Sequence, residues 1–135
     1  MMKIIASLSL MLLLVACSGQ NQFYKAEDFE KVKKIDSHVH LRNEHGLFAQ
    51  CAIKDNFRLV TIMIDRSNSQ NAVQGQKKNA LSQKNRHPEA IEFFTCFSME
   101  GWDEEEWVDN TIASIDSSIN EGAAGVKIWR NIGMT

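Results

Sequence analysis

The chain has 135 residues, 44% of them hydrophobic, and its 15 basic and 17 acidic side chains give a net charge of −2. This length allows one modest core, since domains most often have roughly 100–150 residues. The charges are scattered along the sequence, without the basic patch that binds nucleic acid and without a charged tail. We therefore expect no nucleic-acid partner.

The first residues have the organisation of an export signal. Met1, Met2 and Lys3 form a short basic start, and an apolar run follows over residues 4–15. This run is too short to cross a bilayer as a helix, which needs about 20 apolar residues. We interpret residues 1–16 as a signal peptide.

The end of the apolar run predicts a lipid anchor. Leu14-Val15-Ala16-Cys17 resembles the lipobox of bacterial lipoproteins, in which the peptide is cut before the cysteine and the cysteine is lipidated. Ser18 in the next position resembles signals that lead to the outer membrane. We expect a lipoprotein of the bacterial cell envelope, anchored through Cys17 and facing the periplasm; the alternative is an ordinary cleaved signal. Residues 17–30 then form the lipidated cysteine and a polar tether.

Four short segments have the composition of strands, and three segments between them have helical character. The strands are expected over residues 32–39, 58–64, 91–97 and 125–129, and the helices over 46–56, 69–85 and 103–122. In the third helix Asp103 and Glu106 match a capping box and Gly122 is placed to end it. Its apolar face consists of Val108, Ile112, Ile115 and Ile119.

This alternation predicts an α/β fold with a parallel sheet and right-handed crossovers, either an open doubly wound sheet or a (β/α)8 barrel. Barrels need about 250 residues, so four strands make half of one. We expect residues 31–135 to form the N-terminal half of a TIM barrel. In both architectures ligands gather at the carboxyl ends of the strands.

Two histidines stand at the end of the first expected strand. His38 and His40 are two residues apart, so the period of a strand places both imidazoles on one face. Neutral imidazole is a favoured ligand of zinc and related metals. A lone His-x-His pair is usually incidental, but this one follows an apolar strand and comes two residues after Asp36. We therefore expect a divalent metal, with zinc the best fit.

From about Lys34 onward the sequence resembles the amidohydrolase superfamily, in particular its amidohydrolase-related branch. The matching segments are Ile35-Asp36-Ser37-His38-Val39-His40-Leu41, His87-Pro88-Glu89 and Glu121-Gly122-Ala123-Ala124-Gly125-Val126-Lys127-Ile128-Trp129. The resemblance implies that His38 and His40 bind the metal. It also implies a hydrolase in which a metal-activated water attacks a small-molecule amide, ester or lactone.

Lys127 has two interpretations under this resemblance. Two-metal members of the superfamily carry a carboxylated lysine at the end of strand four, which bridges the ions. One-metal relatives do without it, and there Lys127 would bind substrate or pair with a carboxylate. The metal count therefore stays open.

The family's remaining ligands and its general-base aspartate come from later strands, beyond Thr135. We therefore expect the sequence to be a fragment that is inactive alone. Asp65, Arg66, Glu100 and Trp102 follow expected strands and are interpreted as solvated loop residues. His45 is expected to be exposed, and His87 lies at the end of the sheet away from the catalytic mouth.

The alternatives are a decarboxylase, a phosphoesterase or deoxyribonuclease-like TIM-barrel enzyme, and a non-catalytic lipoprotein binding domain. Lys127 argues mildly against the phosphoesterases, whose strand-four ligand is commonly Glu or His. Cys51 and Cys96 have apolar neighbours, so we expect two buried free thiols rather than a disulfide. Neither the substrate nor the oligomeric state follows from the sequence.

Overall fold

The computed structural model describes residues 23–130 and residue 132, so the predicted signal peptide and Cys17 lie outside the described residues. The elements are η1 (Ala26–Asp28), β1 (Lys34–Val39), α2 (Leu47–Lys54), β2 (Phe57–Ile62), α3 (Gln70–Arg86), β3 (Ile91–Thr95), α4 (Trp107–Asn120) and β4 (Gly125–Val126). The predicted alternation of strands and helices is confirmed. Among the strands, the largest difference in length is at β4, which is two residues long where 125–129 was expected.

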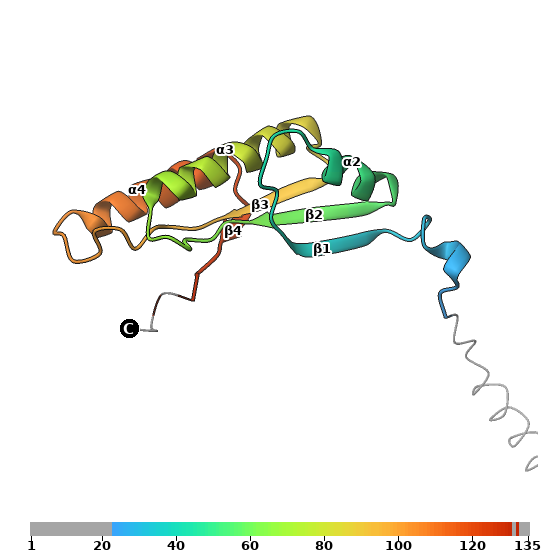
Figure 1. The fold of residues 1–135 in the computed structure, drawn as a ribbon, viewed down its shortest axis with the longest axis horizontal. Helices are drawn as coiled ribbons and strands as arrows, with labels where there is room; N and C mark the ends of the chain where they lie inside the picture. Colours follow the sequence, from blue (N-terminus) through green and yellow to red (C-terminus); the bar gives the residue numbers. More distant parts are fainter. Residues whose placement is uncertain (1–22, 131, 133–135) are drawn as a thin grey trace, which may run out of the picture.

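The four strands form one parallel sheet in the order β1-β2-β3-β4. Each crossover therefore moves one strand along the sheet in the same direction, and the order never reverses. Helices α2, α3 and α4 all lie on one face of the sheet (Figure 1). The α/β class and the parallel sheet predicted from the sequence are confirmed.

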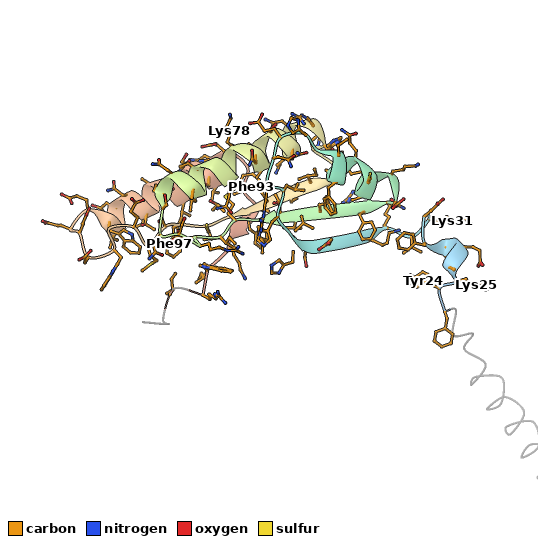
Figure 2. All side chains as sticks on the ribbon, in the orientation of Figure 1. Tyr24, Lys25, Lys31, Lys78, Phe93 and Phe97 are labelled. Carbon is orange, nitrogen blue, oxygen red and sulfur yellow. The ribbon has the colours of Figure 1, made fainter. Side chains whose placement is uncertain are left out.

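The core lies between this sheet and its single helical layer. One cluster of buried residues joins β3 to α3, and a second joins β1, β2 and α2. Their members are Met63, Val73, Ala80, Phe93, Cys96 and Ala123 in the first cluster, and Val39, Leu41, Ala49, Leu59 and Ile91 in the second. Figure 2 shows Phe93 between the strands and the helices, and Lys78 on the outer side of α3.

The opposite face of the sheet has no helix over it in the described part of the chain. Ile35 of β1 pairs in register with Arg58, the residue before buried Leu59, so alternation turns Ile35 away from the helices. Its side chain is 70% exposed. This sheet therefore has a buried face and an open face, and the open face carries apolar side chains.

Helix α4 begins later than predicted, and the predicted capping box is wrong. The N-cap is Glu106 rather than Asp103, and it makes no side-chain capping bond. Instead the indole of Trp107 donates to the carbonyl of Ser98, 3.0 Å away, which fixes the first turn from outside the helix. The predicted end is confirmed, since Gly122 takes a φ of +98° just after the helix.

The apolar face of α4 is only partly used. Val108, Ile112 and Ile119 are 56%, 53% and 44% exposed, and the only fully buried residue of the helix is Ser118. Helix α3, by contrast, buries Val73, Lys77, Ala80 and Gln83. The last described helix therefore carries an apolar stripe that nothing in the described residues covers.

The two described cysteines have different surroundings. Cys96 is buried and free, as predicted, but Cys51 is free and exposed, so the prediction that it is buried is wrong. Helix α2 is short and buries only Ala49 fully, which leaves Cys51 on its outer side. None of the helices among the described residues is long and apolar enough to cross a membrane.

Candidate metal centre

His38 lies in β1 next to a β-bulge, and His40 is the residue that follows the strand. The register with β2 runs regularly to Asp36↔Leu59 and resumes at Val39↔Thr61, so β1 has one extra residue between these pairs. Within the bulge the carboxylate of Asp36 accepts a hydrogen bond from the backbone N–H of His38, at 3.1 Å. The rings of His38 and His40 lie edge to face, with their centroids 5.5 Å apart.

The contact of the His40 ring fixes its neutral tautomer. Nδ1 of His40 lies 2.9 Å from the backbone carbonyl oxygen of Ile62, at the end of β2. A carbonyl can only accept, so Nδ1 must carry the proton and Nε2 keeps its lone pair. The next residue is also anchored, because the N–H of Leu41 donates to the hydroxyl of Thr61 at 3.1 Å. Metal-ligating histidines commonly have the same arrangement, in which the ring nitrogen that does not bind the metal donates to a carbonyl. In the half-buried His40 that nitrogen is Nδ1.

The geometry of the pair fits one shared divalent ion. Zinc binds imidazole nitrogen at about 2.0–2.1 Å, so two imidazoles on one tetrahedral ion have ring centroids about 5 Å apart. The separation of 5.5 Å between His38 and His40 is close to this value. Across residues 23–130 and 132, no group of three or more His, Cys, Asp or Glu side chains could hold a metal. The described chain therefore offers two ligands.

Two cavities adjoin His40. A cavity of about 340 Å³ is lined by His40, Arg42, Arg66 and the α3 residues Gln76 and Asn79, among others. A second, of about 330 Å³, lies on the side of the β1–α2 loop and α2, where His45 and Phe48 line it. A small molecule in either cavity would meet His40 at the carboxyl end of the sheet.

Lys127 follows β4, at the opposite edge of the described sheet from the histidines. Its N–H extends the ladder to the carbonyl of Thr95, and alternation places it on the side of Gly125, which faces the ring of Phe94. Strands β1 and β4 are the two edges of the described sheet, so three spacings of about 4.8 Å, roughly 14 Å, separate them. Curvature of the sheet would be needed to bring Lys127 to a shared site.

Asp65 is not the solvated loop residue that was predicted. Its side chain is 1% exposed, and it accepts hydrogen bonds from the N–H of Ser69, the hydroxyl of Ser98 and the N–H of Met99, at 3.0, 3.3 and 2.8 Å. The carboxylate therefore ties the β2–α3 loop to the β3–α4 loop. Its position directly after an apolar strand was the only sequence signal for this role.

The other polar candidates named in the sequence analysis have the exposure and the position in the fold that were predicted for them. Arg66, Glu100 and Trp102 are exposed, and Glu100 accepts from the N–H of Gln70 at the start of α3. His45 is exposed at the β1–α2 loop. His87 is the C-cap of α3, just before β3 begins, and so lies at the opposite end of the sheet from the histidine pair.

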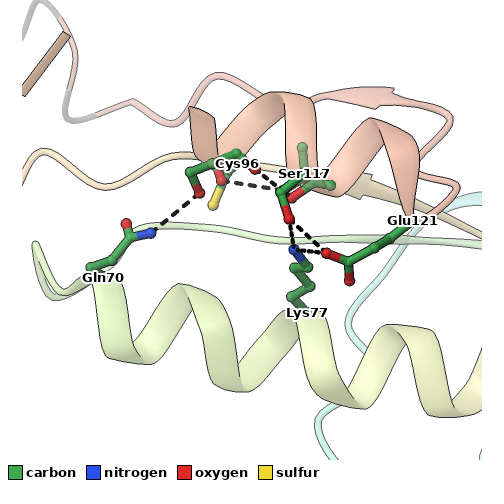
Figure 3. A network of polar contacts seen from close by, with 8 residues as sticks. Gln70, Lys77, Cys96, Ser117 and Glu121 are labelled. Atoms are coloured by element: carbon green, nitrogen blue, oxygen red, sulfur yellow. Dashed lines mark hydrogen bonds and ion pairs between the residues drawn. The ribbon is translucent and has the colours of Figure 1, made fainter. Parts of the chain in front are cut away.

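A polar network between α3 and α4 was missed by the sequence analysis (Figure 3). Lys77, whose side chain is 9% exposed, pairs with Glu121 at 2.7 Å and donates to the hydroxyl of Ser117 at 3.2 Å. The hydrogen bonds from Lys77 and then Ser117 lower the pKa of Glu121. Nearby, burial and the charge of Asp65 raise the pKa of Cys96 to about 12, so this thiol stays protonated.

Comparison of the chain with protein-family models, with curated proteins and with solved structures finds no match.

Proposed function

We propose that this chain forms the first part of a metal-dependent hydrolase of the amidohydrolase type. The observation that carries the proposal is the His38–His40 pair at the carboxyl end of the first strand, with Nε2 of His40 left as the ligating nitrogen. This is the end of a parallel sheet at which active sites of α/β proteins gather. The proposed cofactor is a divalent ion, with zinc the best fit to two imidazoles.

The topology supports a barrel over a doubly wound sheet. A doubly wound sheet reverses its strand order and carries helices on both faces, whereas this sheet has consecutive order and all its helices on one face. In a (β/α)8 barrel the open face becomes the inside, and each helix packs beside the next. The exposed stripe of Val108, Ile112 and Ile119 on α4, beside the free edge of β4, is where a fifth β/α unit would pack.

The described residues would perform three tasks in such an enzyme. His38 and His40 would hold the ion, and the chemistry that such an ion would supply is a water of lowered pKa for attack on an amide, ester or lactone carbonyl. The carbonyl of Ile62 keeps the His40 ring in its ligating tautomer. The cavity of about 340 Å³ beside His40 receives a small-molecule substrate. Lys127 would either help to hold a second ion or contact substrate, and the general base would come from another part of the proposed barrel.

The metal is tested by titrating the purified chain with zinc. We expect the wild type to bind one ion. His38→Ala and His40→Ala should each weaken the affinity by more than about tenfold, because even the loss of a residue that only hydrogen-bonds to a metal ligand typically weakens binding by about tenfold. His87→Ala is the matched control, because His87 lies at the opposite end of the sheet and its loss should leave the affinity unchanged. A wild type without affinity for zinc, cobalt or manganese would favour a non-catalytic binding domain.

We also propose that Cys17 is lipidated and anchors the protein in the outer membrane. The support is the sequence Leu14-Val15-Ala16-Cys17 after a short apolar run. Cells that express the chain with labelled palmitate should incorporate the label into the wild type and not into Cys17→Ser. Equal labelling of both proteins would show that Cys17 is not the anchor.

A further inference from the structure

One face of α3 carries a row of polar side chains directed at the segments around His40. We call this row the α3 stripe; its spacing of three, four and three residues keeps its members on one side of the helix. The members of the α3 stripe are Gln76, Asn79, Gln83 and Arg86. From the sequence alone this row was only part of a polar stretch.

Three members of the stripe hold the loop that follows His40. Nδ2 of Asn79 donates to the carbonyl of Arg42 at 2.9 Å, and Nε2 of Gln83 donates to the carbonyl of Asn43 at 2.8 Å. Arg86 donates to the carbonyl of Glu44. Three side chains on successive turns of one helix thus bind three successive carbonyls of the β1–α2 loop.

The fourth member, Gln76, holds the segment that follows β2. Its Oε1 accepts from the N–H of Ile64 at 3.1 Å and its Nε2 donates to the carbonyl of Ile64 at 2.8 Å. Ile64 lies two residues after Ile62, whose carbonyl binds the His40 ring. One helix therefore holds the segments that directly follow both partners of that contact.

Gln83 makes its contact at a cost to the fold. Its side chain is 1% exposed, and among the described residues its Oε1 has no hydrogen-bond partner. Because the carbonyl of Asn43 can only accept, the amide cannot be turned to relieve this. Gly46, at a φ of +73°, approaches so closely that a Cβ there would lie 2.9 Å from Oε1. A buried acceptor without a partner destabilises a protein, so its presence calls for a reason other than stability.

We propose that Gln76, Asn79 and Gln83 are positioning residues that hold the His40 ring in the orientation in which Nε2 binds the metal. The metal readout of this proposal rests on the proposed function. The orientation of the ring does not, because the tautomer of His40 can be measured in the metal-free chain.

The decisive variant is Gln83→Met in the full chain, with Gln74→Met as its control. Gln74 is exposed on the same helix, so it undergoes the same chemical change without touching the loop. Met keeps the length of the side chain and removes both the donor and the unpartnered oxygen. We expect zinc affinity to fall about tenfold in Gln83→Met, while its melting temperature does not drop. A residue with only a structural role would lower the melting temperature and leave the affinity unchanged.

The second readout is the pair of ¹⁵N shifts of the His40 ring at a pH of about 8, where an ordinary imidazole is neutral. The wild type and Gln74→Met should show the tautomer protonated at Nδ1, and Gln83→Met a mixture of tautomers. Shifts identical to wild type in Gln83→Met would overturn the proposal, whether or not zinc binds. If the wild type binds no zinc but the ¹⁵N shifts of His40 change in Gln83→Met, the metal function is overturned and the positioning role of Gln83 remains supported.

If Gln83→Met does not fold, Asn79→Ala provides the same test with Asn71→Ala as control. Asn79 is only half-buried and alanine favours the helix, so folding should survive. The expected result is again weaker zinc binding and a mixed His40 tautomer. Wild-type values for both measurements would overturn the proposal.

Discussion

His40 donates a hydrogen bond from Nδ1 to the carbonyl of Ile62, 2.9 Å away across the first two strands. In the neutral ring this contact leaves Nε2 as the only nitrogen with a lone pair, which in the proposed metal site would be the ligand. The acceptor is a backbone atom, so no pattern of side chains in the sequence predicts this hydrogen bond. In the proposed site, metal binding would therefore depend on the pairing of β1 with β2.

Zinc affinity should fall as the solution is acidified. Imidazole ligands must be free of the competing proton, so protons and the metal ion compete for the same nitrogens. We expect the affinity to decrease steadily as the pH is lowered from about 8 to about 5 in titrations that monitor bound zinc. An affinity independent of pH over this range would argue for ligands other than His38 and His40.

Replacing Asp65 by Asn should destabilise the fold. The variant Asp65→Asn keeps the shape but places an amide NH₂ among the donors of Ser69, Ser98 and Met99. Hydrogen bonds to charged groups contribute about 1.5–3 kcal/mol each, so we expect the free energy of unfolding to fall by at least about 2 kcal/mol in urea titrations. Asp103→Asn in the exposed β3–α4 loop is the control and should change it by less than about 0.5 kcal/mol.

The ion pair between Lys77 and Glu121 should make stability depend on pH in the acid range. The pKa of Glu121 is lowered in the folded chain from its ordinary value of 4.5, first by the hydrogen bond from Lys77. A carboxyl with a depressed pKa stabilises the fold above its unfolded value, and this contribution is lost as the pH falls through the folded value. Wild type and Glu121→Gln should therefore differ in unfolding free energy at neutral pH and converge in acid.

A Lys77→Met background provides the control for this comparison. Without Lys77 the main cause of the lowered pKa is gone, so Glu121→Gln should have a much smaller effect on the pH profile. An undiminished effect in this background would show that Lys77 is not the partner that matters. The measurement is chemical unfolding at a series of pH values.

The cysteines should differ in reactivity. Cys51 is exposed, whereas Cys96 is buried and burial raises its pKa to about 12. Because the thiolate is the reactive form, iodoacetamide at about pH 8 should alkylate Cys51 in the native chain and Cys96 only after denaturation. Peptide mapping after timed labelling makes the comparison, and equal labelling rates would contradict the burial of Cys96.

The stripe on α4 should tolerate polar substitution in the 135-residue chain. Ile112 is 53% exposed, so Ile112→Lys should change the free energy of unfolding by less than about 0.5 kcal/mol. Met63 is 1% exposed, and Met63→Ala should cost about 2–5 kcal/mol. Ile112→Lys should also reduce the binding of a hydrophobic dye. A large loss of stability at Ile112 would show that another surface covers this stripe.

The elements of this fold were largely predictable, and their ends were not. The apolar runs before His38 and around Leu59 and Phe93 predict strands because burial against a helical layer requires such runs. The start of α4 could not be predicted, because Trp107 is held by Ser98 from a preceding loop rather than by a local cap. The exposure of Cys51 was also missed, because apolar neighbours in sequence do not fix which side of a short helix faces the core.

The sequence by itself determined the β/α alternation, the parallel sheet and the placing of two histidines at the end of the first strand, because periodicity and composition record which faces are buried. Only the tertiary structure decided the tautomer of His40, the burial of Asp65 and the contacts of the α3 stripe with the loop after His40. Each of these is a polar contact between segments far apart in the sequence. A hydrogen bond depends on the position and direction of both partners, and those are set only when the helices pack on the sheet.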